Sequence, residues 1–368
     1  MADNKSCAFV QKDQKQVKKL PVTGDDGSND DKSDRVLEVV AIEDLPECLL
    51  LRIFSYLKGV EDRCSVARTC QDWNRVIKDG AVWKGFTLQD TSSDYQTVKH
   101  LIACGLASSL LDLDLLMSAN NENCVRFLHD RKVWPLFTKL ENLRITNIDI
   151  CAFDFELLPS TLKSLVIYPS KHFLRPIPAR VKCSRQVFPN LEYFEIEDCE
   201  DVFANDQIEQ LCGLEYLLSS AKLHTVILKL MHFRFSHQSL SNMSEKMKTV
   251  KYVCLHAHSI KQRGFQTFLS NLTNVETLNL QFADIDADME TVILASIICL
   301  KELKEIYLSM FWELRSEHIK KMVENLPNLM FIQVYRCRRV KKEHLAEIEK
   351  MRDGLKCQFP DFMRLSFH

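Results

Sequence analysis

The residues best suited to hold a metal ion lie beyond the middle of the chain. His256 and His258 alternate along an expected strand and share a face with Cys254, while His237 precedes them in the sequence. Thiolate and imidazole groups bind zinc, but a structural zinc site needs a closed set of four ligands. We therefore interpret these histidines as polar residues near a strand end and predict no metal site.

Thiol chemistry is the second possibility, because the chain contains 14 cysteines. They are scattered along the sequence without a CxxC pair, and a nucleophilic cysteine would need an electropositive, half-exposed setting. Cys199 and Cys337 instead occupy a repeated position that we expect to turn inward and bond to loop backbone. The nine glycines lie far apart and form no phosphate-binding loop. The sequence predicts no catalytic residue, no cofactor and no enzyme.

The elements that position these residues follow from a repeated pattern, LxxLxLxx, in which L stands for an apolar residue. Its clearest copies start at Leu191 and Leu329, each directly after a Pro-Asn pair. Successive copies lie roughly 22 to 32 residues apart, mostly within the range of about 20 to 29 that is typical of leucine-rich repeats. Looser copies start at Trp83, Leu110, Leu140, Leu162, Leu223, Val250, Val275 and Leu303, and a last strand is expected at 355–359.

Each copy provides a short strand and then a helix, as the helical periodicity of 208–218 and 319–326 indicates. A single copy cannot bury its own leucines, so the copies must stack and share a core. We predict an α/β fold for residues 89–368. It is a leucine-rich-repeat solenoid of about ten degenerate repeats, with parallel strands on the concave face and helices outside.

The concave face is the candidate site for a protein ligand. Side chains that flank the buried positions of each strand point to this face. Aromatic residues there favour a protein interface, although tyrosine also simply suits strands. We favour contact with a protein substrate through Tyr168, Tyr193, Tyr252, Tyr307, Phe331 and Tyr335.

A basic run follows the last clear strand and consists of Arg336, Arg338, Arg339, Lys341 and Lys342. Such a run can bind an acidic or phosphorylated segment. We favour the simpler interpretation, a solvated group of charges.

Residues 42–83 carry more apolar side chains than their own helices can bury. Pro46 follows Glu43 and Asp44 and predicts a helix start, and shorter helices are expected at 62–69 and 71–79. The first helix is apolar on several faces. A unit of about forty residues leaves a large share of its surface exposed. The surplus predicts a docking surface for another protein.

The residues of this stretch resemble the F-box motif: Leu-Pro-Glu-Cys-Leu-Leu at 45–50, Ile-Phe-Ser-Tyr-Leu at 53–57, then Cys70, Trp73 and Trp83. One departure is segment 58–63, which looks one residue longer than the usual form. With the repeats that follow, residues 42–368 resemble the F-box/leucine-rich-repeat class of ubiquitin-ligase receptors.

The resemblance implies an N-terminal three-helix F-box that binds the adaptor Skp1 and, through it, a cullin–RING ligase. The alternative is a three-helix bundle that packs only on its own chain. The residues of this sequence that match the motif, and so would contact Skp1, are Leu45, Pro46, Leu49, Leu50, Ile53, Phe54, Leu57, Cys70 and Trp73.

Composition limits the remaining possibilities. A net charge of −2 gives no field that favours nucleic acid or an anionic membrane as a partner. Residues 1–41 have too few apolar side chains to fold and form no signal peptide, and the longest apolar run, of about nine residues, is short of the ~20 that span a membrane. We expect a soluble intracellular protein, cytoplasmic and/or nuclear, with a disordered tail at 1–41, an F-box at 42–88 and the solenoid at 89–368.

The function that these expectations support is that of a non-catalytic substrate-recognition subunit of a Skp1–cullin–F-box ubiquitin ligase. The F-box would bind Skp1, and the concave face would bind a target protein for ubiquitination and degradation. The alternative is a leucine-rich-repeat scaffold or inhibitor that serves no ligase.

Overall fold

The fold of the chain is that of a computed structural model. It divides into two units, Met1–Leu45 and Pro46–His368, and all the elements below belong to the second. The expected tail at 1–41, with the first helix's expected cap at Glu43 and Asp44, lies outside the described residues. Those residues are 42, 45–57, 59–89, 105–116, 128–148, 153–169, 179–180, 188–197, 209–212, 214–235, 237–260, 262–283 and 285–360.

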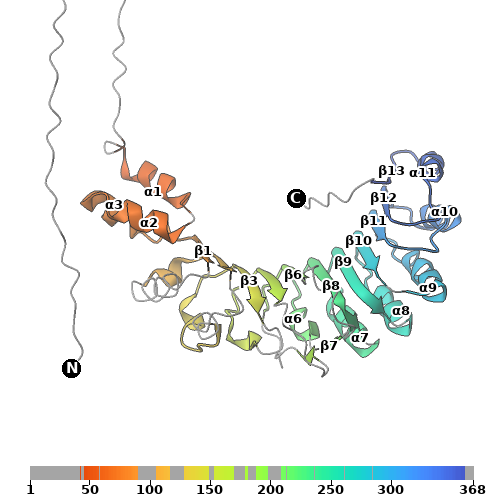
Figure 1. The fold of residues 1–368 in the computed structure, drawn as a ribbon, viewed down its shortest axis with the longest axis horizontal. Helices are drawn as coiled ribbons and strands as arrows, with labels where there is room; N and C mark the ends of the chain where they lie inside the picture. The colour runs from red at the N-terminus through yellow and green to blue at the C-terminus, as the bar shows by residue number, and fades with distance from the viewer. Residues whose placement is uncertain are drawn as a thin grey trace, which may run out of the picture. The chain divides into compact units, whose positions relative to one another are not determined.

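Three short helices open the second unit (Figure 1): α1 (Glu47–Ser55), α2 (Val60–Ala67) and α3 (Gln71–Ile77). Pro46 is the N-cap of α1, and its carbonyl accepts hydrogen bonds from the amides of Leu49 and Leu50. Helix α2 begins two residues before its expected start, directly after Gly59, whose extended backbone forms the N-cap.

A continuous path of parallel strands follows the helices, in chain order (Figure 1). The second apolar residue of each sequence repeat pairs with its counterpart in the next strand, for example Leu278 with Ile306 and Ile306 with Ile332. This register confirms the repeat pattern and the parallel fold. The strands are β1 (Gly85–Gln89), β2 (Asp112–Leu116), β3 (Asn142–Ile148), β4 (Ser164–Pro169), β6 (Tyr193–Glu197), β8 (Thr225–Phe235), β9 (Tyr252–Ile260), β10 (Thr277–Phe282), β11 (Glu305–Ser309), β12 (Phe331–Tyr335) and β13 (Lys356–Gln358).

Helices lie on one side of this sheet in its C-terminal half (Figure 1). The apolar residues between sheet and helices, such as Leu278, Phe268 and Ile293, are fully buried. No helix in the described ranges is long and apolar enough to cross a membrane. The helices are α6 (Leu214–Leu217), α7 (His237–Lys246), α8 (Gln262–Asn271), α9 (Ala287–Ile297), α10 (Ser316–Asn325) and α11 (Lys342–Glu349), with short 3₁₀ turns at Leu106–Ser109, Trp134–Leu136 and Phe155–Leu157.

The prediction of a helix at 208–218 is largely wrong. Residues Glu209–Cys212 form strand β7, and only Leu214–Leu217 are helical. Strand β8 is longer than its neighbours, and its far end pairs with β7, which also pairs with β5 (Ala179–Arg180). The backbone groups of 209–212 therefore enter a strand ladder, which overrides the helical spacing of the side chains.

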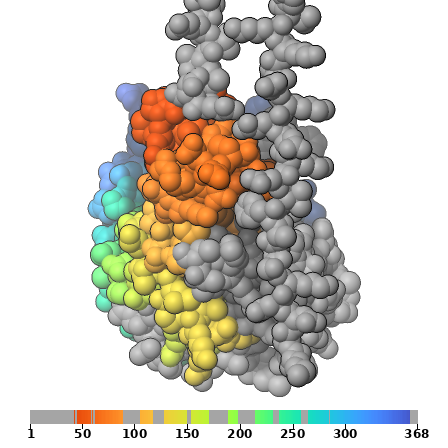
Figure 2. Space-filling model, turned by 90° about the vertical axis from the view of Figure 1, so that its left-hand side faces the viewer, coloured from red at the N-terminus to blue at the C-terminus, as the bar shows by residue number. Residues whose placement is uncertain are grey.

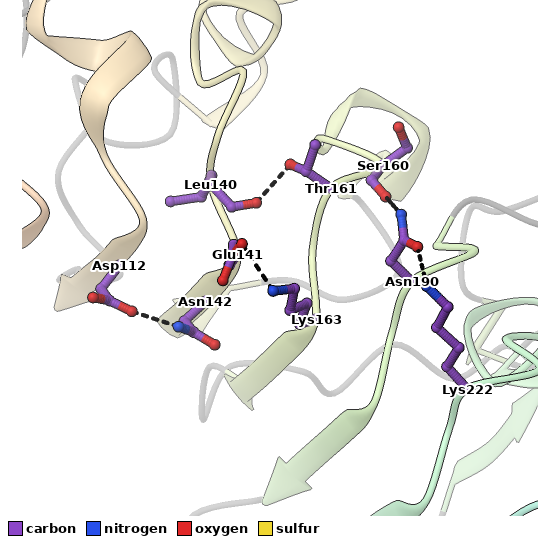
Figure 3. Close-up of polar contacts among 9 residues, drawn as sticks. All are labelled: Asp112, Leu140, Glu141, Asn142, Ser160, Thr161, Lys163, Asn190 and Lys222. Atoms are coloured by element: carbon purple, nitrogen blue, oxygen red, sulfur yellow. Dashed lines mark hydrogen bonds and ion pairs between the residues drawn. The ribbon is translucent and has the colours of Figure 1, made fainter.

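A side chain just before the first apolar residue of several repeats ties that repeat to the previous one. At this position Thr161 and Thr249 donate to the carbonyls of Leu140 and Leu223, at 2.6 and 2.9 Å. The longer side chains of asparagines at the same position reach two residues further back (Figure 3). Asn190, Asn274 and Asn328 donate to the carbonyls of Ser160, Lys248 and Lys301, at 3.2, 2.7 and 3.1 Å. The Asn of each Pro-Asn pair is thus a link between repeats.

Charged side chains alternate along the residues that precede the strands. Lys163 pairs with Glu141 at 2.9 Å (Figure 3), and Glu276 lies between Lys251 and Lys304. The hydrogen bonds from Lys304 and Lys251 lower the pKa of Glu276 to about 2. Because the three lysines are exposed and the two glutamates are only half-buried, each pair adds little to stability.

Candidate interaction surfaces

Helix α1 presents an apolar surface to solvent. Leu49, Ile53 and Tyr56 are 44%, 40% and 72% exposed, and Leu49 and Ile53 are one helical turn apart. Figure 2 shows that helices α1 to α3, coloured red to orange, lie at the surface of the molecule. Exposed large apolar side chains that lie together mark an interaction site more often than single ones do.

A neighbouring side of α1 packs on α3. Leu50 and Phe54 are only 5% and 2% exposed, and the Phe54 ring meets Trp73 edge to face at a centroid distance of 5.2 Å. Glu47 and Arg75 form a two-pronged ion pair between the same helices, with both N–O distances at 2.9 Å. Leu50 and Phe54 therefore hold the three helices together and are not themselves open to a partner.

The other residues that match the motif divide in the same way. Pro46 and Cys70 are exposed, whereas Leu57 and Trp73 are half-buried. The Cys70 sulfur accepts a hydrogen bond from the Trp73 amide at 3.4 Å and so caps α3. Leu45 is half-buried and ends the first unit. Of the predicted set, Pro46, Leu49 and Ile53 are the members open to solvent on or beside α1.

Arg63, a residue without a predicted role, connects α2 to the first strand. It is 2% exposed; its Nε donates to the Leu57 carbonyl and its Nη2 to the Gly85 carbonyl, both at 2.7 Å. Its guanidinium also lies over the Trp83 ring. Burial lowers the pKa of Arg63 to about 10. An arginine in a helix is usually solvated, so no sequence pattern identified this contact.

The six aromatic residues predicted to bind a substrate lie on the face of the sheet opposite the helices, and all are half-buried. Strand register places Tyr193, Tyr252 and Phe331 in one row across the sheet, through Thr225, Thr277 and Glu305. Tyr307 lies in the next row, with its ring 5.3 Å from that of Phe331. Tyr335 is the last residue of β12, and Tyr168 is the last but one of β4. The aromatic residues are thus spread over several rows.

Carboxylates fix two of these tyrosines. The Tyr193 hydroxyl donates to Glu195, and the Tyr307 hydroxyl donates to Glu305 at 3.1 Å. Burial is the main cause that raises the pKa of Tyr193, and it raises the pKa of Tyr307 to about 12. Both hydroxyls are therefore protonated at neutral pH, and their rings are held in place.

Two side chains near the centre of this face are buried. Cys254 and His256 alternate with the core positions of β9 and so share the face of Tyr252, yet they are only 0% and 6% exposed. The His256 Nε2 lies 3.4 Å from the Cys254 sulfur and 3.3 Å from the Asn279 Oδ1. Strands lie only about 4.8 Å apart, so the larger side chains of adjacent strands cover the smaller ones.

A thiol beside an imidazole can act as a nucleophile, but only as a thiolate. Burial raises the pKa of Cys254 to about 12 and lowers the pKa of His256 to about 4. Both groups are therefore neutral and inert at physiological pH. Within the described ranges, no three His, Cys, Asp or Glu side chains form a metal-binding group, and the side chain of His258 lies outside them.

Cys337 has the inward position that the repeat pattern predicted. It is buried, and its thiol donates to the carbonyls of Leu308 and Tyr335 at 3.7 and 3.4 Å. Cys199 lies outside the described residues.

The F-box-like family model matches residues 42–89, which hold the three helices and the first strand. Together with the stacked repeats, this match makes the chain similar to the class of F-box/leucine-rich-repeat proteins.

Within the class, the chain is similar to F-box/LRR-repeat protein 12 of Mus musculus. The two are 24% identical over 314 residues, which cover 78% of this chain and 94% of that protein. F-box/LRR-repeat protein 5 of Danio rerio is 45% identical over 51 residues, covering 14% of this chain and 7% of that protein.

Two solved structures are also similar. One is a Bacteroides fragilis protein, with a TM-score of 0.40 and 12% identity, covering 74% of this chain and 73% of that one. The other is a chain of the yeast Rad7 and Elc1 complex, with a TM-score of 0.39 and 15% identity, covering 84% and 92%.

Proposed function

We propose that this chain is the substrate-recognition subunit of a Skp1–cullin–F-box ubiquitin ligase. The observation that carries the proposal is the exposed apolar surface of Leu49, Ile53 and Tyr56 on the first helix of an F-box-like module. Skp1 is the partner that would cover this surface. Apolar side chains grouped at the centre of a contact supply most of its binding energy.

In this proposal the repeats hold a target protein, and the chain performs no catalysis and needs no cofactor. It places a lysine of the target near the charged ubiquitin-conjugating enzyme, which converts an encounter in solution into a nearly intramolecular reaction. The half-buried aromatic residues opposite the helices are the proposed contacts with the target. The proposed place of action is the cytoplasm or the nucleus.

The first experiment tests Skp1 binding. The full-length chain and its Leu49→Asp/Ile53→Asp variant are each expressed with Skp1, and the amount of Skp1 that co-purifies is measured. Because both side chains are exposed, the variant keeps the packing of Phe54 on Trp73 and loses the contact, by at least about a hundredfold in affinity.

The matched control is Leu136→Asp/Met351→Asp, which places the same charges at apolar residues 41% and 41% exposed outside the three helices. It should retain Skp1. Equal retention by both variants would contradict the proposal.

A second experiment separates a ligase receptor from a scaffold. Proteins that bind the full-length chain but not its Tyr252→Ala/Tyr307→Ala variant are identified as candidate targets. Each is then offered to the chain assembled with purified Skp1, cullin, RING protein and E2. Ubiquitination that requires the chain supports the receptor; binding without ubiquitination of any target favours the scaffold.

A further inference from the structure

An open pocket of about 460 Å³ lies beside the loops that follow β11 and β12. Trp312 comes from the first loop, Arg336, Cys337, Arg338 and Val340 from the second, and Phe359 follows β13. The volume is within the range of small-ligand and side-chain pockets, about 300 to 1,000 Å³.

Two arginines at this pocket lie over aromatic rings, and neither has an acidic partner within the part of the chain that the structure describes. The Arg338 guanidinium carbon lies 4.5 Å from the centroid of Trp312, and that of Arg336 lies 5.2 Å from the centroid of Tyr335. Both arginines are exposed, and no ion pair joins either to a described carboxylate. Their neighbour Arg339 differs, because it pairs with Glu313 at 2.7 Å.

The loops beneath the arginines are anchored. The Glu313–Arg339 ion pair, at 2.7 Å, joins the first loop to the second. The Cys337 thiol bonds to the Leu308 carbonyl and so fixes the second loop to β11. The pocket is therefore formed before a ligand arrives, which lowers the entropic cost of binding.

The charges around the pocket indicate what it binds. A guanidinium that stacks on a ring keeps its N–H edge free for a two-pronged contact with an oxyanion. Lys341 and Lys342 continue the positive charge from the pocket to the start of α11, and both are exposed. Positive charge that is spread along a surface fits several carboxylates in a row better than one phosphate group, which needs donors converging on one point.

We propose that this pocket binds an acidic peptide segment whose carboxylates contact Arg336 and Arg338 and whose bulky apolar side chain enters beside Trp312 and Phe359. Only the assignment of this segment to a target protein rests on the proposed function. It replaces the simpler interpretation of the basic run as solvated charge, because Trp312 and Phe359 add an apolar cavity to the charges.

The experiment uses the full-length chain and a fluorescein-labelled peptide, Asp-Glu-Asp-Glu-Phe-Glu-Asp-Glu-Asp, with binding followed by anisotropy at about 0.1 M salt. Matched peptides replace every acid by its amide, or Phe by Ala. We expect Arg336→Gln/Arg338→Gln to weaken binding about tenfold or more, because two charge-assisted contacts are lost. Each matched peptide should also bind more weakly.

The control variant is Lys246→Gln/Lys321→Gln, which removes the same charge from exposed residues of α7 and α10. It should bind like the unmodified chain. Trp312 provides a second measurement: the acidic peptide should change the tryptophan fluorescence of the unmodified chain, and Trp312→Phe should remove that change.

Four outcomes would overturn the proposal. They are equal binding of the amide peptide, equal loss in the control variant, tighter binding of a neutral peptide that carries one phosphoserine, and binding only after residues 361–368 are deleted, which would make that segment the occupant. Skp1 should co-purify with Arg336→Gln/Arg338→Gln, so failure here is distinguishable from failure of the ligase proposal.

Discussion

The guanidinium carbon of Arg63 lies 4.6 Å from the centroid of the Trp83 ring. Trp83 in turn donates from its indole nitrogen to the Ile77 carbonyl at 2.6 Å, at the end of α3. One buried arginine thus joins α2, the end of α3 and, through the Gly85 carbonyl, the first strand of the repeats. This contact couples the three-helix module to the sheet.

Arg63→Met is therefore expected to destabilise this junction. Methionine keeps much of the apolar stem but loses two hydrogen bonds from a charged donor, so we expect a loss of about 2 to 3 kcal/mol in the free energy of unfolding. Urea unfolding followed by tryptophan fluorescence measures it. Arg68→Met, at an exposed position just after α2, is the control and should change stability by less than about 0.5 kcal/mol. A loss of similar size in both variants would contradict this role for Arg63.

His256 predicts a dependence of stability on pH. Its folded-state pKa of about 4 lies below the unfolded value of 6.5, so the unfolded state binds the proton first. The stabilisation is complete above about pH 6.5 and is lost as the pH falls through about 4, and it is on the order of 3 kcal/mol. The unfolding free energy measured by urea at several pH values should fall across this window.

The neighbours of His256 in this cluster are Cys254, Asn279 and Lys229, and desolvation dominates the shift. His256→Gln should therefore flatten the pH dependence between 4 and 6.5, while His224→Gln, at an exposed residue, should not. Parallel curves for His256→Gln and the unmodified chain would exclude this explanation.

The asparagine links between repeats should each contribute to stability. Asn274→Ala removes the bond to the Lys248 carbonyl, and Asn328→Ala removes the bond to the Lys301 carbonyl. We expect about 1 kcal/mol for each, since both bonds lie in exposed positions, and about 2 kcal/mol for the double variant. Asn325→Ala, which removes a bond within α10, is the comparison within a repeat. No loss in the double variant would show that the links are incidental.

On helix α1, different residues should support folding and partner binding. Phe54→Ala should cost about 3 to 5 kcal/mol because it leaves a cavity against Trp73. Leu49→Ala should change stability by less than about 1 kcal/mol, since Leu49 is largely exposed, and yet weaken Skp1 binding. Thermal unfolding and Skp1 titration of the same two variants test this. A Leu49→Ala variant as unstable as Phe54→Ala would place Leu49 in the core.

Cysteine reactivity should follow exposure. Cys48, Cys70 and Cys299 are exposed, while Cys254 and Cys337 are buried. Burial raises the pKa of both Cys254 and Cys337 to about 12, so their thiolate forms are scarce at neutral pH. Brief treatment with iodoacetamide followed by peptide mass spectrometry should modify the first group only. Rapid modification of Cys254 would reopen the possibility of thiol chemistry on that face.

The sequence by itself determined the repeat fold and the register of its strands. An apolar residue must recur at the same step of every repeat, because a stacked unit buries only those positions, and Leu278, Ile306 and Ile332 pair as that rule requires. It also identified the F-box stretch and its surplus of apolar side chains. The inward position of Cys337 was predicted correctly, because this position is part of the same repeat pattern.

Only the tertiary structure decided which of those apolar residues are exposed to solvent. Helix α1 is apolar on several faces, so spacing could not separate Leu49 and Ile53 from Leu50 and Phe54; contact with α3 does. The burial of Cys254 and His256, the Arg63 junction and the strand at 209–212 likewise depend on neighbours distant in the sequence. Local periodicity records which side chains share a face, but the elements that pack against that face determine whether it is covered.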